Sequence, residues 1–402
     1  MEKKKALMVV AGGRGVPDAL ALLYLKPGLV LPITSIEGWE TETAFLDLAK
    51  RIPGCKVLPM EQIDAYDLDG AIVAIKDFRE QCNKSHPTIE WDWIFTITSA
   101  PKILAFAAYE VAKGLGIPCW YIASQQEKVV SLVKEYEKVD TNRFFHLSFN
   151  DYIKIQGRTY RERKPFPGYR QSVQSWGDVA EAMARSEETS QLLPIFYRHR
   201  KRPGKSIDDA FRDPMFLPPE IETLPLVKWL LKRGMLNVGR TLPEGTPYRF
   251  SSKIAAQFMS TGDWLEVYVW DQINKTKGEG NGKPFADDCR WGCTIPKDEV
   301  EYELDVAVMY KAQLVIAECK TDEQPFRGDN NYLRILEAVA DQLGGDYVSK
   351  VFITNCRKGG ASYEAFYTQA QQLNIEVVTW ERLPKIGEIM KQQAMHPKYP
   401  RK

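Results

Sequence analysis

The sequence predicts two α/β domains, the first of which contains a parallel sheet of Rossmann type. A chain of 402 residues is long enough for two or three domains. In its first part, short apolar runs alternate with stretches of helical periodicity, which is the pattern of a parallel sheet covered by helices. In its last part, strands and helices follow in another order. We therefore divide the chain into residues 1–150, 151–250 and 251–402.

The first domain, residues 1–150, is expected to sense a ligand. Its strands are predicted at residues 5–10, 29–34, 56–58, 93–98, 119–123 and 144–149, and its helices through residue 24, from 41, from 67 and over 102–115. Sheets of this type bind ligands at the carboxyl ends of their strands. Two loops stand there, and their candidate ligand-binding residues are Gly12, Gly13, Arg14, Thr98, Ser99 and Lys102.

The second of these loops, Thr98-Ser-Ala-Pro-Lys102, leads directly into a predicted helix. Free backbone amides and the helix dipole favour an anion at such a place, and Lys102 adds a positive charge. The alternative is that Lys102 is a solvated lysine of the first helical turn. The first loop lacks the full glycine spacing of a dinucleotide-binding loop and gives little support for a dinucleotide site.

The middle segment, residues 151–250, is expected to be a linker with an accessory helical part. It begins with arginines and aromatic rings in alternation, which can hold phosphates and stack bases. A solvated linker is the other interpretation. The residues concerned are Tyr152, Lys154, Arg158, Tyr160, Arg161, Arg163, Lys164, Phe166, Tyr169 and Arg170, and a second basic cluster covers residues 198–205.

The C-terminal domain, residues 251–402, contains two strand-like runs over residues 301–310 and 314–321. Alternate side chains of a strand share a face, so Glu318 and Lys320 project together from an otherwise apolar strand. A hairpin between the two runs would bring Asp305 beside Glu318. Buried charges are costly unless they are paired or bind a metal. A surface Glu-x-Lys pair that closes a strand is the alternative.

Two flanking helices supply further candidates. Gly262-Asp-Trp-Leu-Glu266 opens a helix through residue 273, and Glu266 either faces the acidic site or completes a capping box with Asp263. A second helix is predicted over residues 332–343, where Gln342 either supports the site or is exposed to solvent. A strand over 350–355, a helix over 362–373 and a strand over 375–380 follow.

Asp305 with Glu318-Cys-Lys320 resembles the PD-(D/E)xK nuclease motif, and the order of elements around it resembles the restriction-endonuclease-like core. With the N-terminal Rossmann-like domain and its lysine loop, the chain resembles the CARF-domain nucleases of type III CRISPR immunity. Relatives often carry Thr-Gly-Gly-Thr-Lys where this chain has Thr98, Ser99, Ala100, Pro101 and Lys102, so the lysine is kept and the glycines are not.

The resemblance implies a metal-dependent endonuclease that cuts DNA, RNA or both and acts as a homodimer. Mg²⁺ or Mn²⁺ would be held by Asp305, Glu318 and the carbonyl of Cys319, with Lys320 assisting the attacking water and with Glu266 and Gln342 in support. The activator would be a cyclic oligoadenylate. Cyclic tetra-adenylate is favoured because a two-fold dimer meets an even-membered ring symmetrically.

Composition narrows these expectations further. The net charge of +1 does not indicate a nucleic-acid binder, so any basic surface must be local. No apolar run is long enough to cross a membrane, and the seven cysteines show no disulfide spacing, so a cytoplasmic protein with reduced thiols is expected. Two other functions stay open: a constitutive or differently regulated DNA endonuclease of restriction or repair type, and an inactive nuclease fold that only binds nucleic acid.

Overall fold

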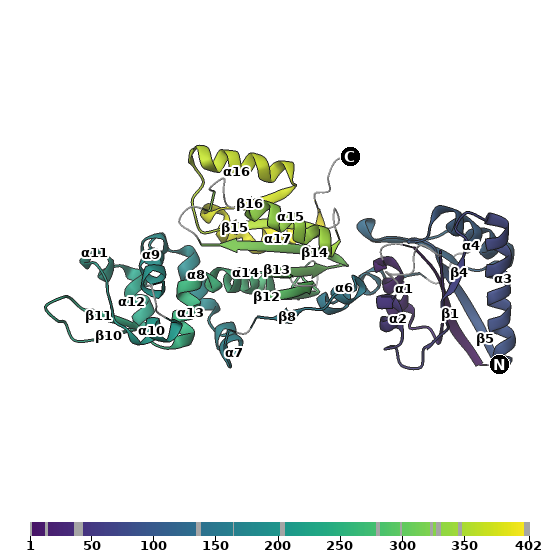
Figure 1. Ribbon diagram of the computed structural model, residues 1–402, viewed down its shortest axis with the longest axis horizontal. Helices are drawn as coiled ribbons and strands as arrows, with labels where there is room; N and C mark the ends of the chain where they lie inside the picture. Colours follow the sequence, from purple (N-terminus) through teal and green to yellow (C-terminus); the bar gives the residue numbers. More distant parts are fainter. Residues whose placement is uncertain are drawn as a thin grey trace. The chain divides into compact units, whose positions relative to one another are not determined.

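The computed structural model describes residues 2–12, 15–35, 43–133, 138–163, 165–201, 206–278, 282–297, 300–321, 325–326, 331–344 and 348–397. The chain forms two compact units (Figure 1). The first comprises residues 1–160 and 309–313, and the second comprises residues 161–308 and 314–402. Both units are α/β structures built on a central sheet, as the sequence predicts.

The first unit contains a seven-stranded sheet in the order β3-β2-β1-β5-β6-β7, with β4 also paired to β2. The bounds are β1 Glu2–Ala11, β2 Leu29–Ser35, β3 Lys56–Val57, β4 Glu61–Ile63, β5 Ile89–Thr96, β6 Cys119–Ala123 and β7 Lys128–Ser131. All pairs are parallel except β6 with β7. In the sheet, β2 lies along one edge of β1 and β5 lies along the other. The direction in which successive strands are added therefore reverses between β1 and β5. The Rossmann-type prediction is confirmed.

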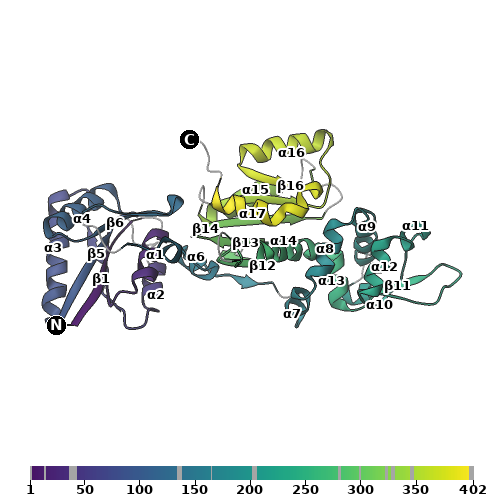
Figure 2. The same cartoon turned by 180° about the vertical axis from the view of Figure 1, so that it is seen from behind.

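Helices cover both faces of this sheet. They are α1 Val16–Leu25, α2 Thr43–Ala49, α3 Leu68–Ser85 and α4 Lys102–Leu115. Figures 1 and 2 show α1 and α2 on one face and α3 and α4 on the other. Met8, Leu31 and Phe95 from three neighbouring strands are fully or almost fully buried between these layers. The second halves of β1 and β5 are apolar and buried because both faces of the sheet are covered there, whereas their first halves carry charged residues.

The strand predicted over residues 144–149 is wrong. Two helices, α5 Thr141–Phe144 and α6 Phe149–Ile155, occupy this stretch. Asp140 accepts hydrogen bonds from the amides of Asn142 and Arg143 at the start of α5, and Ser148 accepts one from the amide of Asp151 in α6. These side chains cap the helices, and the apolar residues between them are aromatic rings that pack into the core.

The sheet of the second unit has the order β16-β15-β14-β13-β12-β8. Its strands are β8 Arg161–Glu162, β12 Asp288–Lys297, β13 Val300–Tyr310, β14 Gln313–Lys320, β15 Val348–Thr354 and β16 Ile375–Val378. The hairpin of β13 and β14 turns through Lys311 and Ala312, which both have positive φ, as in a type I′ turn. This hairpin brings the strand of Asp305 beside the strand of Glu318 and Lys320.

Four helices accompany this sheet, namely α14 Asp263–Lys275, α15 Tyr332–Leu343, α16 Gly360–Gln372 and α17 Ile386–Met395, with the 3₁₀ helix η4 Trp380–Lys385 before α17. The predicted order of helix, strand, strand, helix, strand, helix and strand is present with one addition, because β12, which the sequence did not predict, comes between α14 and β13. The residues between β8 and α14 form α7 Tyr169–Gln174, α8 Gly177–Arg185, α9 Thr189–Arg200, α10 Ile207–Arg212, α11 Pro219–Glu222, α12 Pro225–Lys232 and α13 Lys253–Thr261. A three-stranded antiparallel sheet of β9 Met215–Phe216, β10 Leu236–Val238 and β11 Pro247–Phe250 lies among them in the sequence.

No helix among the described residues is both long and apolar enough to span a membrane.

Candidate active site

The β13–β14 hairpin brings Asp305, Glu318 and Lys320 together. Asp305 is only 4% exposed, and its Oδ2 accepts a hydrogen bond of 2.6 Å from the amide of Cys319 on the neighbouring strand. The Nζ of Lys320 lies 3.7 Å from the same Oδ2 and forms an ion pair with Glu318. A surface Glu-x-Lys pair does not fit, because Glu318 and Lys320 are largely buried and share a third charged partner.

Burial sets the charge of this group. Burial, together with the nearby Asp305 carboxylate, raises the pKa of Glu318 to about 7, although Lys320 opposes the change. Burial works against a charged Lys320, yet the carboxylates of Asp305 and Glu318 raise its pKa above the usual value. Lys320 is therefore positively charged and pairs with both Asp305 and Glu318.

Glu266 extends the acid group from α14. It is 5% exposed, and burial followed by the charge of Asp305 raises its pKa well above the usual value. Its partner is Arg163, whose Nη2 lies 2.8 Å from Oε1 and 2.9 Å from Oε2 of Glu266. Arg163 also pairs with Glu303, two residues before Asp305 on the same face of β13. The arginine thus links α14 to the strand of Asp305.

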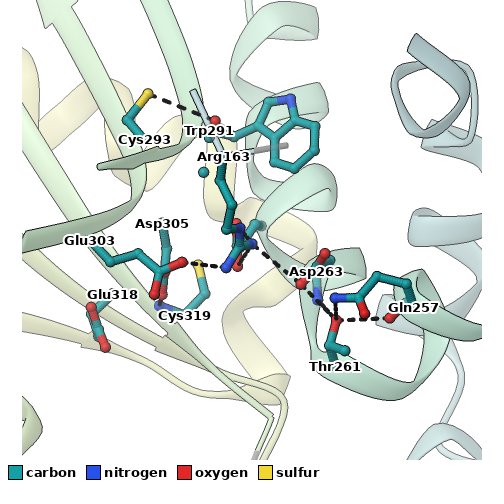
Figure 3. A network of polar contacts seen from close by, with 12 residues as sticks. Arg163, Gln257, Thr261, Asp263, Trp291, Cys293, Glu303, Asp305, Glu318 and Cys319 are labelled. Carbon is teal, nitrogen blue, oxygen red and sulfur yellow. Dashed lines mark hydrogen bonds and ion pairs between the residues drawn. The ribbon is translucent and has the colours of Figure 1, made fainter. Parts of the chain in front are cut away.

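A second layer of hydrogen bonds holds this arrangement (Figure 3). Asp263 lies 3.3 Å from the Nη2 of Arg163 and receives hydrogen bonds from Tyr169 and from Thr261, the latter of 2.6 Å. Tyr169 is fully buried and comes from α7. Arg163, Asp263 and Glu266 therefore have fixed orientations before any ligand binds.

Gly292 of β12 passes close to these charges. Its φ is +53°, and a Cβ added there would lie 3.5 Å from Oε2 of Glu266 and 3.6 Å from Nε of Arg163. Glycine suits this positive φ, which residues with a side chain rarely adopt. The carbonyl of Gly292 also accepts a 2.7 Å hydrogen bond from the amide of Arg163.

The donor set suits a hard divalent cation. Asp305 and Glu318 offer carboxylate oxygens from adjacent strands, and the pKa of Glu318 is raised first by burial and then by the charge of Asp305, a charge that a cation would offset. Burial raises the pKa of the Cys319 thiol well above its usual value, so Cys319 can contribute only its carbonyl oxygen. Among the described residues, no three His, Cys, Asp or Glu side chains are grouped closely enough to hold a metal by themselves. Such a site would have to be completed by the carbonyl and by water or substrate oxygens.

The structure places the other predicted residues of this domain differently. Gly262, not Asp263, is the N-cap of α14, and the capping box is absent because Asp263 and Glu266 are engaged with Arg163. Gln342 is half-buried near the C-terminal end of α15. Lys320 instead meets this helix at its other end, where its Nζ lies 5.2 Å from the centre of the Tyr332 ring.

Sequence analysis does not predict the positions of two residues in the site, Arg163 and Glu303. Arg163 was interpreted as a substrate contact or part of a linker, but it lies among Glu266, Asp263 and Glu303. Arg161, Glu162 and Arg163 alternate in charge, a pattern that is also common in exposed segments. Arg163 reaches the site only because β8 pairs with β12, which sequence analysis does not predict. Glu303 could have been found from its spacing of two residues from Asp305 along a strand.

The candidate ligand loops of the first unit meet at the edge where β1 and β5 end. Val9 pairs with Thr96 in the parallel ladder, so both loops begin at the same level. A Cβ added to Gly12 would lie 2.4 Å from Cδ of Pro101, so the loops are in contact. Lys102 is exposed at the first turn of α4. Gly13 and Arg14 lie outside the described residues.

Thr98 and Ser99 are both engaged by hydrogen bonds. Thr98 accepts one of 2.7 Å from the amide of Ile122, and Ser99 donates one to Asp18 of α1. Asp18 is 1% exposed, and its Oδ1 has no partner among the described residues. Burial raises the pKa of Asp18 to about 7, although hydrogen bonds from Ser99 and Thr96 oppose the change. A buried acid thus lies directly under the lysine loop.

Residues 253–397 match the model of the Card1-like endonuclease domain. This stretch contains Asp263, Glu266, Glu303, Asp305, Glu318 and Lys320, and the match confirms the nuclease resemblance for the C-terminal part of the chain. No protein with a curated description matches the sequence.

Solved structures share the fold of the whole chain at low sequence identity. Can2 from Sulfobacillus thermosulfidooxidans, in complex with cyclic tetra-adenylate, has 17% identity and a TM-score of 0.69, covering 97% of each chain. Protein VC1899 from Vibrio cholerae has 18% identity and a TM-score of 0.72, covering 98% of this chain and 99% of its own. A type III CRISPR defence DNA nuclease activated by cyclic oligoadenylate has 15% identity and a TM-score of 0.54, and this chain covers 53% of it. The predicted two-domain fold is confirmed.

Proposed function

We propose that this protein is a divalent-metal-dependent endonuclease of type III CRISPR defence, activated by a cyclic oligoadenylate. The observation that carries the proposal is the meeting of Asp305, Glu318 and Lys320 across β13 and β14 within the stretch that matches the Card1-like endonuclease domain. Two carboxylates and one lysine on adjacent strands are groups suited to metal-assisted phosphodiester hydrolysis.

Each group has a role that its surroundings favour. Asp305, Glu318 and the carbonyl of Cys319 would hold Mg²⁺ or Mn²⁺, which when bound lowers the pKa of water and offsets charge on the phosphate. Lys320 is held as a cation by its two acidic neighbours and can orient the attacking water or stabilise the developing negative charge. Glu266 is fixed by Arg163 and supports the cluster from α14.

The first unit supplies the proposed sensor. The loops after β1 and β5 lie where the strand order reverses, which is where sheets of this kind bind ligands. Backbone amides at the start of α4 and the exposed Lys102 suit a phosphate. The similar Can2 structure contains cyclic tetra-adenylate, and the similar CRISPR nuclease is described as activated by cyclic oligoadenylate. These relatives support the same ligand class here.

The proposed active form is a homodimer that binds cyclic tetra-adenylate. Each chain has one Lys102 in this loop, whereas a ring with an even number of nucleotides has phosphates related by a two-fold axis. Two copies of the loop related by a two-fold axis would meet such a ring in identical ways. Activation then requires that the ring bind the active arrangement more tightly than the resting one.

The test is a cleavage matrix with the purified full chain. Plasmid, single-stranded DNA and RNA are each incubated with Mg²⁺ or Mn²⁺ and with cyclic tri-, tetra- or hexa-adenylate, and parallel samples contain EDTA. We expect cleavage only when both a divalent metal and a cyclic oligoadenylate are present, and we expect the fastest cleavage with cyclic tetra-adenylate. Cleavage that persists in EDTA contradicts the metal mechanism. Cleavage that is equal without any ring favours the constitutive restriction or repair enzyme.

A further inference from the structure

A large cavity in the second unit borders the acid cluster. Its volume is 1270 Å³, and its walls come from α9, the end of α13 and the segments that follow β14 and β15. Gly262 and Thr321 line it, and these residues directly precede Asp263 and follow Lys320 in the chain. One residue advances the backbone by only about 3.8 Å, so the wall of the cavity begins one position away from Asp263 and Lys320.

The wall of the cavity is joined to the acid cluster by hydrogen bonds. Thr261 lines the cavity and donates a 2.6 Å hydrogen bond to Asp263, which in turn pairs with Arg163 (Figure 3). Gly262 has a φ of +96°, and a Cβ there would lie 2.7 Å from Oγ1 of Thr321. The two walls therefore touch at the end of the cavity that is nearest to Lys320.

The charges of the lining favour an anionic ligand. The charged lining residues are Arg198, Arg357 and Glu187, which gives two cations and one carboxylate. Arg198 donates its Nε to the carbonyl of Pro194 at 3.1 Å, which leaves its terminal nitrogens for a ligand. Arg357 pairs with Glu187 at 2.8 Å, but both side chains are more than half exposed. An exposed pair of this kind is weak, and a phosphate can replace the carboxylate.

Three aromatic rings line the same cavity, from Tyr197, Phe326 and Trp380. Tyr197 is 44% exposed, and the Nζ of Lys201 lies 4.6 Å from the centre of its ring, so an accessible aromatic surface stands beside a cation. The guanidinium of Arg357 lies 4.5 Å from the centre of the Trp380 ring. Rings beside arginines are the groups that hold bases by stacking and phosphates by charge.

Asn355 adds a polar group with no partner. It follows β15, lines the cavity and is 8% exposed. Its Oδ1 is buried and has no hydrogen-bond partner among the described residues. A buried acceptor of this kind normally has a donor, and an amino or imino group of a base can supply one.

We propose that this cavity holds an unpaired nucleotide of the substrate strand beside the phosphodiester that is cut. The inference rests on the proposed nuclease function and adds the substrate-binding surface. In a duplex, each base is stacked between neighbouring bases. Stacking on Tyr197 or Trp380 therefore requires a single strand or a base that is flipped out of the helix. The arginines hold the backbone, and the strand then continues past Thr321 to Asp305 and Glu318.

The test measures binding without cleavage. The full chain with Glu318→Ala, in EDTA, is titrated against a fluorescent single-stranded DNA of mixed sequence and against the same DNA as a duplex. Adding Tyr197→Ala should weaken single-strand binding about tenfold, because the base loses the ring on which it stacks. Adding Arg357→Ala should reduce the salt dependence of binding by about 0.7 in the slope of log K against log salt.

Matched variants outside the cavity provide the controls. Phe216→Ala removes a ring that is 40% exposed, and Arg233→Ala removes an exposed arginine paired with Asp178 at 2.6 Å. Neither should change the affinity. Equal losses in the controls, no loss in Tyr197→Ala, or an equal loss for the duplex would each overturn the proposal. Failure of the proposed function is seen separately, as cleavage by Glu318→Ala in the presence of metal.

Discussion

Arg163 and Glu266 are 103 residues apart in the sequence, yet the Nη2 of Arg163 lies within 2.9 Å of both carboxylate oxygens of Glu266. Glu266 is almost completely buried, and the arginine also contacts Asp263 and Glu303. One guanidinium therefore pairs with three acids, while Lys320 pairs with Asp305 and Glu318. The site depends on a residue that precedes its domain core by a hundred positions.

The first prediction concerns Arg163. Arg163→Met should destabilise the second unit by about 3–5 kcal/mol, because it leaves a buried acid without its partner. Adding Glu266→Gln should recover much of this loss, since it removes the unpaired charge, but should not restore cleavage. Urea unfolding and initial cleavage rates measure the two effects. Arg161→Ala is the control, because Arg161 pairs with Glu301 at the exposed surface and should matter little.

The second prediction concerns the chemistry. Glu318→Ala and Lys320→Ala should each lower the cleavage rate by at least about 100-fold, because each removes a group in contact with the reacting phosphate or its metal. Binding of cyclic tetra-adenylate, measured by calorimetry, should stay as in the wild type. Glu301→Ala, an exposed acid on the strand of Asp305, should cut normally. Activity retained by Glu318→Ala would remove Glu318 from the mechanism.

The third prediction concerns the activator. Lys102→Ala should raise the ring concentration needed for half-maximal cleavage by at least about 100-fold, because in the proposed dimer it removes a charged hydrogen bond of about 1.5–3 kcal/mol from each of the two copies. The rate at saturating ring should change little. Lys113→Ala, at the other end of α4 and paired with Glu110, is the matched control. If Lys102→Ala bound the ring tightly but stayed inactive, the lysine would transmit the signal and not bind phosphate.

The fourth prediction concerns the pH dependence of stability. The pKa of Asp18 is 3.8 in the unfolded chain and about 7 in the fold, because of burial. The folded state therefore keeps a proton that the unfolded state has lost, and the unfolding free energy falls as pH rises from about 4 to 7. Between pH 5.5 and pH 8 the fall should be about 2 kcal/mol.

Asp18→Asn should remove this fall and make the first unit more stable than wild type at pH 8. Urea unfolding at both pH values, followed by a probe in the first unit, provides the measurement. Asp69→Asn in the first turn of α3 is an exposed control. A pH dependence that is the same in Asp18→Asn and wild type would show that Asp18 is not the group responsible.

The sequence by itself determined the parallel sheet of the first unit and the hairpin that carries the central acids, but not β8 and β12 of the second sheet. Uninterrupted apolar strands predicted the covered parallel sheet around β1 and β5, and strand alternation placed Glu318 and Lys320 on one face. These features depend on neighbours in sequence or on a tight hairpin, so local patterns carry them. The strand predicted over residues 144–149 failed because buried aromatic residues are common to strands and to short capped helices.

Only the tertiary structure decided how the charges are neutralised. Asp263 and Glu266 have the spacing of a capping box, but the approach of Arg163 from β8 gives them another partner. The cavity between α9, α13 and the segment after β15 likewise joins residues from separate parts of the chain. Pairing energies depend on distance and burial, and neither is encoded in the spacing of residues along one segment. Sequence analysis therefore predicted the acids Asp305, Glu318 and Glu266, whereas the tertiary structure determined their ion-pair partners and their pKa values.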